Sequence, residues 1–157
     1  MRETLFNWLQ TRIEGARCLD LYAGSGALGL EALSRGAASV VFVEQQRHAT
    51  LALETVLRDW QAVGATVVCT QSQRFLTGTG RDFDLVFLDP PFGSGELANA
   101  AAALERGWLA DNARIYIEHA RTDPLPALPA AWHELRAGTA GEVGYHLFAP
   151  SRSGPPA

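Results

Sequence analysis

The residues best suited to chemistry form the motif Asp-Pro-Pro-Phe at 89–92, which follows the apolar run 85–88 directly. Neither proline has an N–H group to donate to a strand, so backbone carbonyls at the motif are left to face outward. The Asp89 carboxylate and the Pro90 carbonyl are then placed to accept from both N–H groups of a planar amine. Phe92 is placed to stack on the ring that carries the amine, a contact worth about 1–3 kcal/mol. The motif therefore predicts a site for a flat molecule with an exocyclic amino group.

The same residues suit methyl transfer to that amine. An exocyclic amine is a poor nucleophile because its lone pair is conjugated with the ring, and acceptors on both N–H groups favour a geometry that exposes the lone pair. We therefore assign catalytic roles to Asp89, Pro90 and Phe92. Asp89 is the principal acceptor and the candidate for taking the released proton, whereas Pro91 and Phe92 are predicted to contact the base. The alternative interpretation is a surface turn after a core strand.

The second motif is a glycine turn at 23–26, between an apolar segment and a segment of helical pattern. Gly24, Gly26 and Gly29 form the spacing G-x-G-x-x-G, which permits a tight turn and a close approach of the backbone to a ligand. Dinucleotide-binding domains use the same spacing. The glycines alone therefore do not distinguish NAD from S-adenosylmethionine.

Two acidic residues narrow the choice of cofactor. Glu44 lies 18 positions beyond Gly26, where a carboxylate accepts both hydroxyls of a ribose in either cofactor. Asp20, just before the turn, would repel a pyrophosphate but attract the ammonium or sulfonium group of S-adenosylmethionine. A hydride-transfer enzyme also has no evident use for the motif at 89–92. These residues favour a methyltransferase over a nicotinamide-dependent dehydrogenase.

Alternating strands and helices must position these motifs. The pattern predicts strands at 17–22, 39–44, 65–70, 83–89 and 114–118. It predicts an opening helix with Leu5, Phe6, Leu9 and Ile13 on one face, and further helices at 27–34, 47–60 and 96–109. Such alternation implies βαβ units with right-handed crossovers. Because ligands of open α/β sheets bind beyond the carboxyl ends of the strands, the motifs should meet in one crevice.

The end of the chain departs from this alternation. Residues 132–137 and 144–149 are predicted to be strands joined by a glycine-rich turn at 138–141. A mostly parallel α/β sheet that ends in an antiparallel hairpin is the arrangement expected of a Rossmann-like methyltransferase fold. We assign residues 1–149 to a single domain of this class and predict a disordered tail at 150–157.

Composition excludes several other classes of protein. The 157 residues carry a net charge of −4, which argues against a large basic footprint for nucleic acid. No apolar run approaches the roughly 20 residues that span a bilayer, and no signal peptide precedes the first helix. Cys18 and Cys69 fit no zinc spacing, and in the sequence the four histidines show neither metal-ligand spacing nor a paired acid. We expect a cytoplasmic, metal-free monomer with no membrane association.

The chain resembles the bacterial RsmD family, whose members methylate the N2 amine of one guanine in 16S ribosomal RNA. The resemblance runs from residue 2 to about residue 148. It rests on segments 2–9, 19–32 and 89–92, with further matches at 107–109 and 141–145. The opening segment, Arg-Glu-Thr-Leu-Phe-Asn-Trp-Leu, is the most particular to this family, whereas many methyltransferases share the other two motifs.

The resemblance implies a cofactor, a partner and a set of binding residues. S-adenosylmethionine would be held by Asp20, Tyr22, Gly24, Ser25, Gly26, Glu44, Gln45, Gln71 and Ser72. Gln71 falls where such enzymes often place an acidic or amide residue against the adenine. Phe6 and Asn7 lie either beside the methionine end of the cofactor or in a helix-packing position. The implied partner is 16S ribosomal RNA within a small subunit or its assembly intermediate. Family members usually carry a basic arm ahead of residue 2, which would supply the positive charge for RNA.

Three alternatives stay open at this stage. The amine could belong to adenine N6 in DNA or to a glutamine side chain in a protein, although such enzymes more often show Asn-Pro-Pro-Tyr. The domain could instead be a cofactor-binding or RNA-binding module without activity. A nicotinamide-dependent dehydrogenase is the third.

Overall fold

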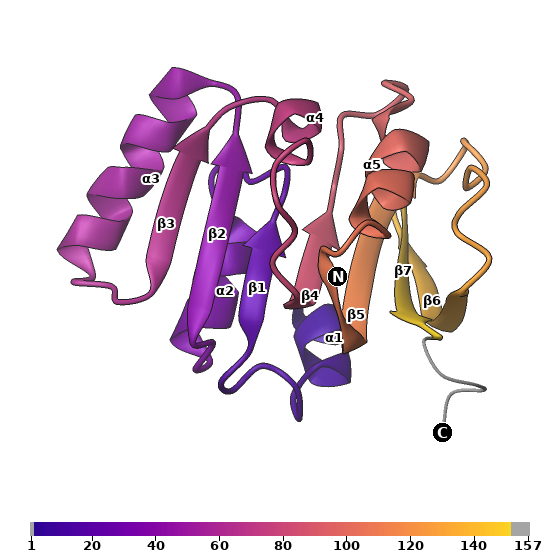
Figure 1. Ribbon diagram of the computed structural model, residues 1–157, viewed down its shortest axis with the longest axis horizontal. Helices are drawn as coiled ribbons and strands as arrows, with labels where there is room; N and C mark the ends of the chain where they lie inside the picture. Colours follow the sequence, from indigo (N-terminus) through magenta and orange to yellow (C-terminus); the bar gives the residue numbers. More distant parts are fainter. Residues whose placement is uncertain (1, 152–157) are drawn as a thin grey trace.

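A single seven-stranded sheet forms the centre of the molecule in the computed structural model, which describes residues 2–151 (Figure 1). The strands are β1 (Arg17–Asp20), β2 (Ser39–Glu44), β3 (Ala65–Cys69), β4 (Phe83–Leu88), β5 (Leu109–Ala120), β6 (Trp132–Ala140) and β7 (Val143–Pro150). The helices are α1 (Arg2–Trp8), α2 (Ala27–Ser34), α3 (Arg47–Asp59), α4 (Ser72–Phe75) and α5 (Glu96–Leu104). Among these helices, none is long and apolar enough to cross a membrane.

The strand order β3-β2-β1-β4-β5-β7-β6 confirms the predicted architecture. Strands β1 to β5 pair in parallel, and β7 runs antiparallel to both β5 and β6. The chain passes from β3 across the sheet to β4, on the other side of β1. This reversal of strand order opens a crevice at the carboxyl ends of β1 and β4, where ligands of such sheets bind.

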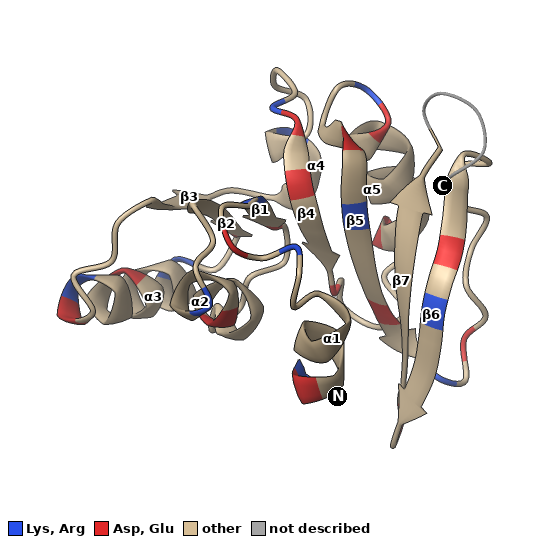
Figure 2. Cartoon of the chain, turned by 90° about the horizontal axis from the view of Figure 1, so that it is seen from below, with Lys and Arg blue, Asp and Glu red and all other residues tan. Residues whose placement is uncertain are grey.

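Helices cover both faces of the sheet, so the central strands are apolar on both sides. Helices α1, α2 and α3 lie on one face and α4 and α5 on the other (Figure 2). Along β4, Leu85 and Phe87 pack on the α1 face, whereas Val86 and Leu88 pack on the α5 face. Because side chains alternate along a strand, the next residue, Asp89, falls on the α1 face.

Two boundaries differ from the prediction because a glycine interrupts the pattern. The helix predicted at 96–109 ends at Leu104, since Gly107 adopts a positive φ of 85° and the chain then enters β5. The turn predicted at 138–141 is shorter, because β6 continues to Ala140 and turns at Gly141, with a φ of 58°. Gly138 serves packing instead, since a Cβ there would lie 2.7 Å from Cζ of Tyr145.

Other differences lie in short segments. The opening helix ends at Trp8, yet Ile13 is buried as predicted. Strand β5 spans far more than the predicted 114–118, and the four-residue helix α4 was not predicted. The predicted tail begins too early, because Pro150 belongs to β7 and the Ser151 N–H donates to the Ala131 carbonyl at 2.7 Å. Residues 152–157 lie outside the described part of the chain.

Candidate active site

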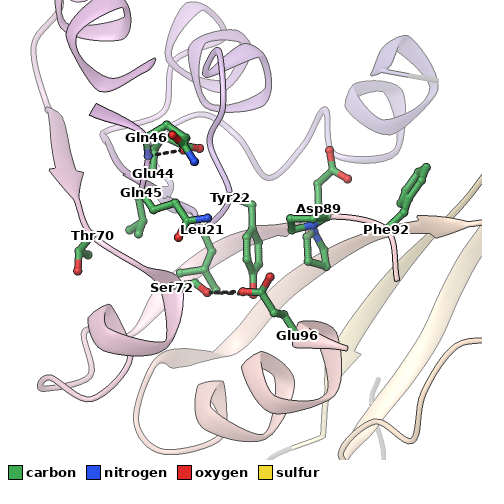
Figure 3. A pocket seen from close by; sticks show the side chains of 13 residues that line it. Leu21, Tyr22, Glu44, Gln45, Gln46, Thr70, Ser72, Asp89, Phe92 and Glu96 are labelled. Carbon is green, nitrogen blue, oxygen red and sulfur yellow. Dashed lines mark hydrogen bonds between the residues drawn. The ribbon is translucent and has the colours of Figure 1, made fainter. Parts of the chain in front are cut away.

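A cavity of about 440 Å³ opens at the carboxyl edge of the sheet (Figure 3). Its walls come from the ends of β1, β2, β3 and β4 and from the start of α5. The predicted site residues that line it are Tyr22, Glu44, Gln45, Ser72, Asp89, Pro90, Pro91 and Phe92. Thr70, Gln46 and Glu96 line it too and were not predicted. In Figure 3, Glu44 and Asp89 lie on opposite sides of the Tyr22 ring.

A second cavity of about 500 Å³ adjoins the first on the α1 side of the sheet. Tyr22 and Asp89 line both cavities, and the predicted residues Asp20, Gly24 and Ser25 line the second. Arg2, from α1, also reaches it. The structure thus brings the glycine turn, Glu44 and the Asp-Pro-Pro-Phe motif to one crevice.

Two predicted cofactor residues line neither cavity. Gly26 has a positive φ of 83°, and a Cβ there would lie 2.6 Å from Cδ1 of Leu53, so this glycine lets α3 pack against the turn. Gln71 is exposed and caps α4, without a hydrogen bond from its side chain to the helix. Its neighbours in sequence, Thr70 and Ser72, face the first cavity instead.

The Glu44 carboxylate is fixed by the backbone around it. Oε1 accepts a hydrogen bond from the Gly24 N–H at 2.9 Å, and Oε2 accepts one from the Gln46 N–H at 2.8 Å. Each carboxylate oxygen has a further lone pair, so both can still accept from a ligand. Glu44 therefore links the glycine turn to β2 and presents two oriented acceptors to the cavity.

Asp20 is a buried acid with only 3% of its surface exposed. Burial raises the pKa of its carboxyl to about 7, aided by the nearby charges of Asp89 and Glu44, although the hydrogen bond from the Gly29 N–H opposes the shift. Oδ2 accepts that bond at 3.1 Å. Gly29 must lack a side chain, because a Cβ would lie 2.3 Å from Cε1 of Phe42. The third glycine of the motif thus serves helix packing.

In the Asp-Pro-Pro-Phe motif, Asp89, Pro91 and Phe92 are exposed, whereas Pro90 is buried. Asp89 faces the crevice, and no hydrogen bond from the described residues reaches its carboxylate. Desolvation by the surrounding protein nevertheless raises its pKa. Phe92 is 55% exposed, so its ring is available to a planar ligand. The Pro91 carbonyl accepts from the Ser94 N–H at 3.2 Å, which holds the loop that follows.

Sequence reasoning missed a polar contact between α4 and α5. The buried Ser72 hydroxyl lies 3.2 Å from the Tyr22 hydroxyl and 3.4 Å from Oε1 of Glu96. Burial raises the pKa of Tyr22, the Ser72 hydrogen bond opposes this, and the Glu96 charge adds to it. Glu96 follows Gly95 at the first turn of α5, and an acid at a helix start is a recognisable signal.

Glu118 was also missed. It ends the apolar part of β5 as Glu44 ends that of β2, is only 8% exposed, and lines the second cavity. Burial raises its pKa to about 7, with a contribution from Asp89, against the hydrogen bond with Tyr116. Asp20, Asp89 and Glu118 therefore form an acidic group in the crevice. No three acidic, histidine or cysteine side chains of residues 2–151 are arranged to hold a metal ion.

The fold also gives His146 an acidic neighbour, which no spacing in the sequence indicates. Its Nδ1 lies 2.5 Å from Oε1 of Glu134, and its Nε2 lies 2.9 Å from Nε2 of His119. Glu134 belongs to β6 and His146 to β7, so the antiparallel hairpin creates a pairing that the spacing in sequence does not reveal.

Comparison with known proteins agrees with this geometry. The family described as "Conserved hypothetical protein 95" matches residues 1–149. The chain is 46% identical over 149 residues to ribosomal RNA small subunit methyltransferase D of Escherichia coli K12, covering 94% of this chain and 75% of that protein. The chain belongs to the RsmD family. The Haemophilus influenzae protein of the same name is 42% identical over 154 residues, covering 94% of this chain and 79% of that one.

A solved structure of a similar protein has the same fold as this chain. A protein from Escherichia coli superimposes with a TM-score of 0.93 at 45% identity, covering 97% of this chain and 86% of that chain. The Rossmann-like methyltransferase fold predicted from the sequence is therefore confirmed. The structure locates two of the segments that carry the resemblance. Residues 2–9 form α1 and the residue after it, and residues 89–92 form the rim of the crevice.

Proposed function

We propose that this protein transfers the methyl group of S-adenosylmethionine to the N2 amine of a guanine in 16S ribosomal RNA. The observation that carries the proposal is the Asp-Pro-Pro-Phe motif at the rim of two adjoining cavities. Family membership supports methyl transfer, and the names of the relatives support ribosomal RNA of the small subunit as the substrate. A ribosomal substrate implies a cytoplasmic site of action.

The residues of the crevice fit S-adenosylmethionine. Glu44 has two oriented acceptors for the ribose hydroxyls, beside Gln45 at the end of β2. Asp20 provides negative charge for the ammonium and sulfonium groups, and Arg2 in the same cavity suits a carboxylate. When bound, the cofactor supplies an electrophilic methyl group.

The Asp-Pro-Pro-Phe motif fits the amine of a base. Asp89 accepts from one N–H of the amine and the Pro90 carbonyl from the other, while Phe92 stacks on the ring and Pro91 contacts its edge. The new bond would join the methyl carbon to N2 as the bond between that carbon and the sulfonium sulfur breaks, leaving a neutral thioether, and N2 would lose a proton to Asp89. Because desolvation raises the pKa of Asp89, this carboxylate is a stronger base than an ordinary aspartate.

The test is to incubate the full chain with labelled S-adenosylmethionine and small ribosomal subunits that lack the modification, and then to map the labelled nucleotide. We expect label on N2 of one guanine and none with the Asp89→Ala variant. Label on adenine N6, on protein or on no component would overturn the proposal.

A further inference from the structure

Glu118 occupies a distinctive position beside Asp89. Strands β4 and β5 pair in parallel with Leu88 opposite Ile117, so the register brings Asp89 and Glu118 opposite each other one residue later. Tyr116 packs on the α1 face, and alternation places Glu118 on that same face, as Asp89 is. Neighbouring strands lie about 4.8 Å apart, so the two carboxyl groups are adjacent at the edge of the sheet.

Glu118 also lies between two cavities. It lines the second cavity together with Asp89. It equally lines a third cavity of about 400 Å³, whose other walls come from the loop 90–95, the start of α5, the end of β5 and the segment 123–126. Phe92 and the two prolines of the motif also line this third cavity. A base stacked on Phe92 with its amine at Asp89 would therefore present its next ring atom to Glu118.

A purely structural role does not account for this side chain. It is 8% exposed, and among residues 2–151 no ion pair includes it. Its charged neighbours Asp89 and Asp20 disfavour the ionised form. The Tyr116 hydroxyl bonds to the carboxyl group, yet a carboxylate has about four acceptor positions. Burying an acid beside other acids is unfavourable, which is typical of residues placed for function.

We propose that Glu118 determines base specificity by accepting a hydrogen bond from N1–H of the target guanine, while Asp89 holds the adjacent N2 amine. This inference rests on the proposed function and names the part of the base that the site reads. Guanine presents N1–H and N2–H side by side, which suits two adjacent carboxylates. Adenine and 2-aminopurine carry a lone pair at N1, which would face the Glu118 carboxylate unfavourably. Specificity thus comes from repulsion as well as attraction.

The decisive experiment compares guanine with 2-aminopurine, which keeps the N2 amine but lacks N1–H. Small subunits are reconstituted with either base at the mapped target nucleotide, and kcat/KM for methyl transfer is measured with each at about pH 8.5, where Glu118, with its pKa raised to about 7, is ionised. We expect the unmodified protein to prefer guanine by about 10–100-fold, the range of a hydrogen bond to a charged group. Glu118→Gln should lower this preference to about threefold or less, because the Gln amide can donate to N1 of 2-aminopurine.

Controls separate this role from a structural one. Glu142→Gln, at an exposed turn, should keep the preference of the unmodified protein. S-adenosylhomocysteine binding and the unfolding temperature report whether Glu118→Gln folds normally. An unchanged preference for guanine in Glu118→Gln would overturn the role of Glu118 while the proposed function stands. If the unmodified protein methylates no guanine, the proposed function fails and this inference fails with it.

Discussion

The acidic residues on the two sides of the crevice differ in the hydrogen bonds that the chain donates to them. On the β1–β2 side, backbone N–H groups already bind the carboxylates of Glu44 and Asp20. On the β4–β5 side, Asp89 receives no hydrogen bond from a described residue, and Phe92 is 55% exposed beside it. The first side is organised by the chain itself, whereas the second leaves its acceptors and its aromatic ring to a ligand. We infer that the first holds the cofactor and the second receives the base.

Removing Asp89 tests this difference most strongly. Asp89→Ala should lower turnover by about 10²–10⁴-fold, because the amine loses both its acceptor and its base. S-adenosylmethionine should still bind within a few-fold of its normal affinity, since Glu44 and the glycine turn are intact. Single-turnover methylation and calorimetry measure the two quantities. Asp111→Ala, at an exposed position on β5, is the matched control and should change neither.

Glu44→Gln should have the opposite effect to Asp89→Ala, because it should weaken cofactor binding rather than turnover at saturating cofactor. Cofactor affinity should fall about 10–100-fold, because a charged acceptor of two ribose hydroxyls is lost. Stability should also fall by about 1–3 kcal/mol, since the Gln amide nitrogen would face the N–H of either Gly24 or Gln46.

Calorimetry and denaturant unfolding measure these effects, and Glu142→Gln again serves as the control. Loss of turnover at saturating cofactor, with cofactor affinity retained, would contradict the assignment of Glu44 to the cofactor side.

The smallest expected effect is a pH dependence of cofactor binding. Burial raises the pKa of Asp20 to about 7, so its carboxyl holds a proton below that pH and is ionised above it. A cationic ligand lowers this pKa when it binds and releases the proton, so binding should strengthen from pH 6 to pH 8. The gain for S-adenosylmethionine should be about three- to tenfold.

Two comparisons check the cause of the pH dependence. S-adenosylhomocysteine lacks the sulfonium charge and should show a smaller gain. Asp20→Asn should flatten the profile for S-adenosylmethionine, leaving only the contributions of Glu118 and Asp89, whose pKa values are also raised. Equal profiles for both ligands would show that the sulfonium charge does not face these acids.

Much of the site was predictable because its residues directly follow apolar strands. Glu44 and Asp89 each stand where a buried run ends, and Gly24 stands where the first strand turns into a helix. In a parallel sheet these ends share one edge, so local patterns along the chain are enough to bring them together. The hairpin of β6 and β7 was predictable from a different local signal, the glycine-rich turn at 138–141 between two short segments of strand-like sequence.

The rest depends on contacts between distant parts of the chain. Glu118 ends an apolar run as visibly as Glu44 does, but its position beside Asp89 follows from the β4–β5 register. Gly26 and Gly29 match a ligand-binding pattern, yet Leu53 and Phe42 determine why they are glycines. Trp108 lies four residues beyond Leu104 and so continues the helical spacing of apolar residues past the last turn of α5, and periodicity alone could not place the end of that helix.

The paired hydrogen bonds of Glu44 have a consequence for the entropy of binding. A glutamate side chain on a surface samples many rotamers, and immobilising it for a ligand costs about 0.5–1.5 kcal/mol. Here the Gly24 and Gln46 N–H groups restrict the carboxylate when the chain folds. The loss of rotamer freedom belongs to folding, and a ribose that arrives later meets acceptors that are already in place. The affinity of the crevice for its cofactor is therefore set partly by how firmly the glycine turn is folded.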